Sequence, residues 1–137
     1  MNNESLEILG LKYVSGYITQ AEHDDFLAVI DEQNWLTDLK RRVQHYGYRY
    51  DYVGRKVDLD SMYLGPLPTW SDWLITRLLK DKIVKQAPDQ LIINEYQPGQ
   101  GIGSHVDCVP CFGVYNVGVI GSTFFDRFAD YFIWYRS

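Results

Sequence analysis

Residues 91–113 read LIINEYQPGQGIGSHVDCVPCFG, and this stretch decides which fold the chain can adopt. An apolar run predicts a buried strand, a turn rich in glycine and proline follows, and the segment then reaches His105 and Asp107. Side chains two residues apart on a strand project from the same face, so these two can place an imidazole nitrogen and a carboxylate oxygen on one metal ion. A lone H-x-D triplet is also frequent on surface strands, so the pair needs a third ligand and a supporting context.

That context comes from the chemistry of the neighbouring residues. Two histidines and one carboxylate on one face of Fe(II) leave three positions open, which is the ligand set of non-haem iron oxygenases. Upstream, Asn94 and Tyr96 lie two residues apart on the same predicted strand, where an amide and a hydroxyl can donate hydrogen bonds to an organic carboxylate. The alternative for these two residues is a polar edge strand.

The segment resembles the AlkB-type branch of the Fe(II)/2-oxoglutarate dioxygenases, whose pattern is N-x-Y-x-x-G-x-x-(I/L)-x-x-H-x-D. The matching residues are Asn94, Tyr96, Gly99, Ile102, His105 and Asp107. The resemblance covers most of residues 6–113. It implies that His105 and Asp107 bind iron, the catalytic metal, and that Asn94 and Tyr96 hydrogen-bond the cosubstrate 2-oxoglutarate.

A second part of the resemblance lies upstream, where residues 41–52 (RRVQHYGYRYDY) are similar to the nucleotide-recognition lid of AlkB-like proteins, closest to the tRNA wobble-uridine hydroxylase type. Four tyrosines alternate there with single residues, which predicts one strand face, and basic residues precede them. Such a patch can stack on bases and contact phosphates, although a sheet surface that covers the core is an equally open reading. The predicted substrate-side residues are Tyr48, Tyr46 and Arg42.

The remaining elements predict an α+β protein with N-terminal helices packed on a double-stranded β-helix, or jelly-roll, that this chain leaves incomplete. Residues 10–18 are expected to form a short strand. Thr19 and Glu22 form a capping box that begins a helix running to about Gln33. Residues 53–68 read as loop, and residues 70–84 predict a second helix. The apolar stripe of that helix consists of Trp73, Leu74, Leu78 and Leu79.

Length and composition favour a single domain over residues 1–137. With 13 Lys and Arg against 18 Asp and Glu, the net charge of −5 excludes a globally basic nucleic-acid binder and leaves only local basic patches. No leader or membrane-spanning segment is recognisable, so we expect a cytoplasmic monomer. Cys108 and Cys111 are too few for a zinc site and are read as structural or incidental.

The chain departs from the family pattern after Asp107. The family completes its iron site with a distal histidine and binds the far carboxylate of 2-oxoglutarate with a later arginine. Here no histidine follows, and Arg127 and Arg136 stand in a segment unlike the family's. His23 and His45 are read as surface or structural residues. The sequence therefore predicts little or no turnover by these 137 residues.

Our hypothesis for the divergence from about residue 114 is a shift of the reading frame. Residues 115–121 read YNVGVIG, and their codons, read one nucleotide later, can spell Ile-Met-Ser-Val-Ser-Leu-Gly. This resembles the family strand I-x-S-(V/L)-S-L-G. We therefore expect the part of the chain from about residue 114 to be out of frame.

The leading function is an Fe(II)/2-oxoglutarate dioxygenase that hydroxylates or demethylates a modified nucleobase, an oxidoreductase active in nucleic-acid demethylation or tRNA modification. DNA-repair members often carry an acidic residue two positions past the metal Asp, whereas Val109 stands here, which favours RNA over alkylated DNA. The alternatives are an inactive truncated domain that binds nucleic acid or a ligand weakly, and a metal-independent jelly-roll binding module.

Overall fold

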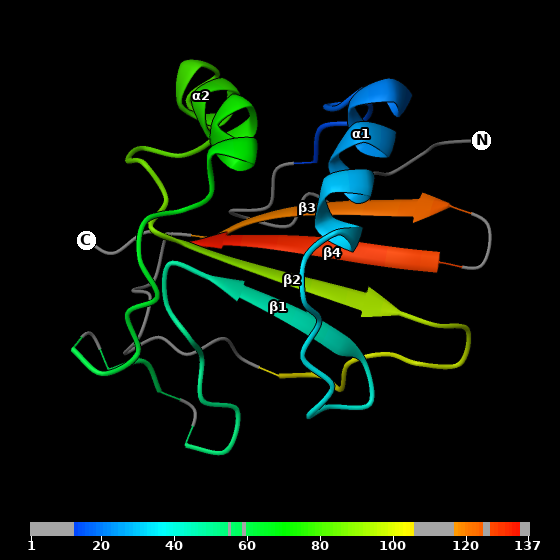
Figure 1. Ribbon diagram of the computed structural model, residues 1–137. Coiled ribbons are helices and arrows are strands. Elements are labelled where there is room, and N and C mark those ends of the chain that lie inside the picture. The colour runs from blue at the N-terminus through cyan, green and yellow to red at the C-terminus, as the bar shows by residue number, and fades with distance from the viewer. Residues whose placement is uncertain (1–12, 55, 59, 106–116, 125–126, 135–137) are drawn as a thin grey trace.

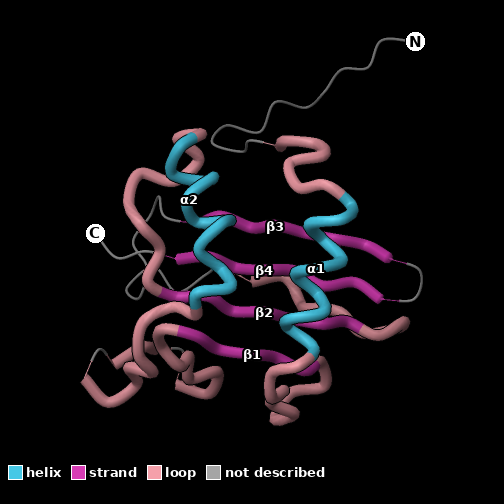
Figure 2. Tube along the Cα trace, turned by 45° about the horizontal axis from the view of Figure 1, so that its top comes forward, coloured by secondary structure: helices cyan, strands magenta, loops and turns pink. Residues whose placement is uncertain are grey.

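The computed structural model describes residues 13–54, 56–58, 60–105, 117–124 and 127–134. These residues form an α+β structure, as predicted, in which two helices cover one face of a four-stranded antiparallel sheet (Figures 1 and 2). The helices are α1 (Gln20–Asp31) and α2 (Asp72–Lys80), the latter preceded by a 3₁₀ turn, η1 (Thr69–Ser71). The strands are β1 (Arg42–Tyr46), β2 (Gln90–Tyr96), β3 (Val117–Phe124) and β4 (Arg127–Trp134), in the order β1-β2-β4-β3.

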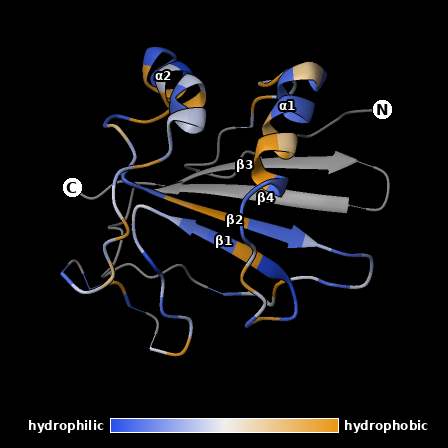
Figure 3. Cartoon of the chain, viewed as in Figure 1, coloured by the Kyte–Doolittle hydropathy of each residue, from blue (hydrophilic) through white to orange (hydrophobic). Residues whose placement is uncertain are grey.

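Strand β2 is central, because it pairs with β1 along one edge and with β4 along the other. All seven of its residues are buried. Figure 3 shows its apolar stretch in the first half and polar residues toward its end. The core lies between this strand and the helices and consists of Phe26, Ile30, Leu74, Leu78, Val84, Leu91 and Ile93.

The predicted start of α1 is confirmed. The Thr19 hydroxyl accepts a hydrogen bond from the Glu22 amide (3.1 Å), and the Glu22 carboxylate accepts one from the Thr19 amide (2.9 Å). These two bonds satisfy amides that the first helical turn leaves unpaired. Glu22 also pairs with Arg77 of α2 (2.9 Å), so the cap joins the two helices.

Helix α2 is shorter than the predicted span of residues 70–84. It ends at Lys80, and Lys82 then adopts a positive φ of 56°. The apolar stripe holds at Leu74 and Leu78, which are 1% and 2% exposed, whereas Leu79 is 36% exposed. No helix in the described ranges is long and apolar enough to cross a membrane.

Two predicted strands are wrong. Residues 13–18 form turns rather than a strand, since Gly16 has a φ of 65° and the segment pairs with no strand that the structure describes; residues 10–12 lie outside the described ranges. The tyrosine strand ends at Tyr46, because Gly47 has a φ of 79°. A Cβ at this glycine would lie 1.9 Å from the Asp89 carbonyl oxygen, so only glycine fits.

Replacement of Leu74 by Ala tests how the helices are held on the sheet. We expect Leu74→Ala to lower the free energy of unfolding by about 3 kcal/mol, because it leaves a cavity in the core. The matched variant Leu79→Ala removes the same atoms from a partly exposed position and should cost less than about 1 kcal/mol. Urea unfolding measures both, and equal losses would contradict the orientation of α2.

Candidate cosubstrate and nucleic-acid site

The sheet face that points away from the helices carries the predicted cosubstrate residues. Side chains alternate along β2, so Leu91 and Ile93 face the helices while Asn94 and Tyr96 project from the other side. The register pairs Val43 of β1 with Asn94. Asn94 and Tyr96 are only 3% and 6% exposed, so this face, which we call the site face, is covered.

Arg41 places a positive charge on the site face. Its Nε donates a hydrogen bond to the Asn94 side-chain oxygen (2.9 Å), and its guanidinium carbon lies 5.7 Å from the ring centroid of Tyr52. The ring of Tyr52 forms T-shaped contacts with the rings of His45 (5.4 Å between centroids) and Tyr50 (5.0 Å). Residues 47–52 therefore fold back over β1 on the side of the sheet opposite the helices (Figure 1).

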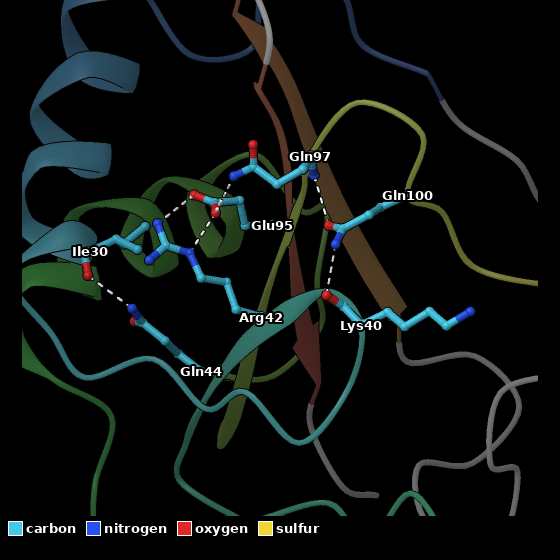
Figure 4. A network of polar contacts seen from close by, with 7 residues as sticks. All are labelled: Ile30, Lys40, Arg42, Gln44, Glu95, Gln97 and Gln100. Carbon is cyan, nitrogen blue, oxygen red and sulfur yellow. Dashed lines mark hydrogen bonds and ion pairs between the residues drawn. The ribbon is translucent and has the colours of Figure 1, made fainter.

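Arg42 takes the opposite side, contrary to its predicted place on the substrate side. Its guanidinium forms a two-bond ion pair with Glu95 (Figure 4). The guanidinium carbon also lies 4.3 Å from the Trp35 ring centroid. Glu95 is 1% exposed, and its charge is balanced by this pair. The side chain of Arg42 therefore lies on the face of the sheet that the helices cover.

Tyr46 also lies on the helix side rather than with the predicted substrate residues. Its ring meets Trp70 at 5.2 Å, and its hydroxyl donates to Gln44 (2.7 Å), which in turn donates to the Ile30 carbonyl (2.9 Å). Burial raises the pKa of Tyr46 to about 12. These contacts join β1 to α1 and leave Tyr46 off the site face.

The turn after β2 is tied to the strand ends. The side chain of Gln97 donates a hydrogen bond to the Glu95 carboxylate (3.2 Å), and the backbone N–H of Gln97 donates one to the side-chain oxygen of Gln100 (2.9 Å). Gln100 donates in turn to the Lys40 carbonyl (2.7 Å; Figure 4). The same network that neutralises Arg42 thus holds the segment leading to His105.

His105, one of the two predicted iron ligands, is exposed. The sequence predicted it on a strand, but the structure places it outside any strand. Its Nδ1 is 2.7 Å from the Gly103 carbonyl oxygen. A carbonyl can only accept, so Nδ1 carries the proton and a neutral ring has its lone pair on Nε2, which is the arrangement of many metal-binding histidines. Asp107, Val109 and both cysteines lie outside the described residues, among which no three His, Cys, Asp or Glu side chains form a metal-sized group.

The other two histidines are structural, as expected. His23 is buried on α1 and lies 3.2 Å from Asp24. His45 accepts a hydrogen bond from the Tyr50 amide (3.4 Å). Burial, with a smaller contribution from Arg49, lowers the pKa of His45 to about 4 against the opposing charge of Asp38.

Tyr48 lies at the base of an aromatic surface that the sequence did not fully indicate. Its carbonyl accepts from Gln90 (3.1 Å), and its ring meets that of Tyr63 at 5.2 Å. A backbone hydrogen bond from Arg49 to Met62 (2.8 Å) joins the two segments. Tyr63 is 54% exposed and comes from residues 53–68, which the sequence presented as loop without periodicity.

Comparison with known proteins assigns the family. No protein-family model matches the chain. Uncharacterized protein L905 of Acanthamoeba polyphaga mimivirus is 37% identical over 72% of the chain. The tRNA (carboxymethyluridine(34)-5-O)-methyltransferase ALKBH8 of Mus musculus is 38% identical over 80% of the chain. The alkylated DNA repair protein ALKBH8 homolog of Arabidopsis thaliana is 35% identical over 80% of the chain. The chain belongs to the AlkB-like family. It is related to members of the tRNA wobble-uridine type.

The AlkB-like match covers part of each relative. The aligned region is 46% of the mimivirus protein, 18% of the mouse protein and 33% of the Arabidopsis protein, so the chain spans less than half of their length. Within this AlkB-like chain, the structure brings Asn94, Tyr96 and Arg41 together on the site face and separates them from Arg42 and Tyr46.

The low pKa of His45 predicts a pH dependence of stability. In the unfolded chain His45 binds a proton below about pH 6.5, whereas in the folded chain it does so only below about pH 4. The unfolded state is therefore favoured as the pH falls between these values, and stability is lost. Between pH 7 and pH 5 the free energy of unfolding should fall by about 2 kcal/mol. Urea unfolding of His45→Gln should show a nearly flat profile in this window, and an equally steep profile would contradict the assignment.

Proposed function

We propose that this chain carries the cosubstrate and substrate sites of an AlkB-type Fe(II)/2-oxoglutarate dioxygenase that hydroxylates or demethylates a modified nucleobase. One observation carries the proposal: Asn94 and Tyr96 lie buried on the site face, beside the Arg41 guanidinium, which lies over the ring of Tyr52. Amide, hydroxyl and guanidinium donors together suit an organic carboxylate. The paired strands β1 and β2, which lie within the region that resembles the family, would belong to one sheet of a jelly-roll.

Iron would be held by His105 and Asp107. The Nδ1 bond of His105 to Gly103 fits that role, because it orients the ring and leaves Nε2 as the basic nitrogen. When bound, Fe(II) with 2-oxoglutarate and O₂ supplies the oxidising chemistry for hydroxylation of a C–H bond. The residues of this chain would contribute by holding the cosubstrate at Asn94 and Tyr96 and the base near Tyr48.

RNA is the favoured substrate. The paired rings of Tyr48 and Tyr63 offer a stacking surface, with exposed Arg49 and Lys56 nearby in the chain to meet phosphates. The mouse relative is named for tRNA and the Arabidopsis relative for alkylated DNA. The similarity of residues 41–52 to the wobble-uridine type favours tRNA as the substrate in this proposal.

The cytoplasmic location, the monomeric state and the altered reading frame from about residue 114 stay predictions.

The second candidate is a domain that binds without turnover. This candidate rests on the sequence: no histidine follows Asp107 among the 137 residues to complete the iron ligands that the family resemblance implies. It would keep nucleic-acid and carboxylate binding on the same surfaces.

Turnover and binding measured on one sample separate the candidates. With Fe(II), 2-oxoglutarate and tRNA bearing modified wobble uridine, succinate formation that is lost in His105→Ala supports the dioxygenase. Binding of 2-oxoglutarate and tRNA without succinate supports the second candidate, which is the outcome we expect of the 137 residues alone. A chain that binds neither 2-oxoglutarate nor tRNA would contradict the AlkB-type site itself.

Replacement of Tyr63 tests the stacking surface. We expect Tyr63→Ala to weaken binding of a single-stranded anticodon-loop RNA by fivefold or more, since stacking on an aromatic ring contributes about 1 to 3 kcal/mol per base. Tyr13→Ala is the matched control, because Tyr13 is 86% exposed and lies far from residues 47–64 in the sequence. Fluorescence anisotropy measures both affinities, and equal effects would show that the ring pair does not contact RNA.

A further inference from the structure

Arg41 and Arg42 are adjacent in the sequence but meet different environments. Arg42 is neutralised by Glu95 through two hydrogen bonds, and its guanidinium lies over the ring of Trp35. Arg41 is half-buried, and no carboxylate in the described ranges lies within ion-pair distance of it. A half-buried guanidinium with no carboxylate in ion-pair distance favours an anion as its partner.

The position of Arg41 points to one kind of anion. The pairing of β1 with β2 begins at Arg42, which lies opposite Glu95. Arg41, one residue before the paired strand, therefore lies opposite Tyr96. Its Nε is used by Asn94 (2.9 Å), and the terminal N–H groups make no hydrogen bond within the part of the chain that the structure describes. These terminal groups form a planar fork that matches a carboxylate.

We propose that Arg41 is the cation that binds the iron-remote carboxylate of 2-oxoglutarate in this chain. The inference rests on the proposed function and deepens it. Iron held by His105 and Asp107 would supply positive charge to the 2-oxo acid end of the cosubstrate, so the far carboxylate would depend on a protein cation. Asn94 orients the guanidinium by accepting from Nε, and Tyr52 covers its face. Arg41 would thereby supply the charge that the family pattern places on a later arginine, to which no residue of this sequence was matched.

Calorimetry with Mn(II) as a redox-inert metal tests this assignment in the intact chain. We expect Arg41→Gln to weaken 2-oxoglutarate binding at least tenfold and Arg41→Lys to give an intermediate loss, because lysine keeps the charge without the fork. Binding of 2-oxobutyrate, which lacks the far carboxylate, should be unchanged by either substitution. Lys85→Gln, at an exposed site on another segment, is the control and should bind as the unaltered chain does.

Three results would overturn the assignment. Unaltered 2-oxoglutarate affinity in Arg41→Gln would refute it while leaving the proposed function intact. Loss of RNA affinity in place of 2-oxoglutarate affinity would assign Arg41 to a phosphate. Absence of 2-oxoglutarate binding by the unaltered chain would refute both the assignment and the proposed function.

A second measurement avoids substitution altogether. The ¹⁵Nε–H signal of Arg41 in the unaltered chain should shift when 2-oxoglutarate is added and stay in place when 2-oxobutyrate is added. An Arg41 signal that responds to neither compound would overturn the assignment, even if a variant failed to fold.

Discussion

Strand β2 is buried on both faces, and this constraint organises the rest of the structure. Its alternation sends Leu91, Ile93 and Glu95 toward the helices and Asn94 and Tyr96 toward the site face. A shift of one residue in register would exchange the two sets, placing apolar side chains in the site and polar ones in the core. The core therefore fixes which polar groups can meet a ligand.

The same alternation continues into β1 and gives two neighbouring arginines separate roles. Arg42 balances the buried Glu95, and through Gln97 and Gln100 this pair also holds the turn that leads to His105. Arg41, one residue earlier, is left for the site face. A structural ion pair and the cation that we propose to bind the ligand thus come from one short basic segment.

Local signals in the sequence were sufficient for α1 and β2, because a capping box and a buried apolar run each specify one structure. They failed where a glycine changes the backbone direction: Gly47 ends β1, so the alternating tyrosines do not share a strand. The pairing of Tyr48 with Tyr63 and of Arg41 with Asn94 joins distant segments, and no periodicity encodes such contacts. The roles of Asn94, Tyr96, His105 and Asp107 came from the family resemblance and stay predictions.

The central claim is that the site face of β2 binds 2-oxoglutarate. It is tested most directly by a crystal structure of the chain with Mn(II) and a non-reacting dicarboxylate analogue of 2-oxoglutarate. The predicted result is a ligand on the side of the sheet away from α1 and α2, with one carboxylate on the Arg41 fork and within hydrogen-bond reach of Asn94 or Tyr96. A ligand bound on the helix side, or bound without contact to these residues, would contradict the claim.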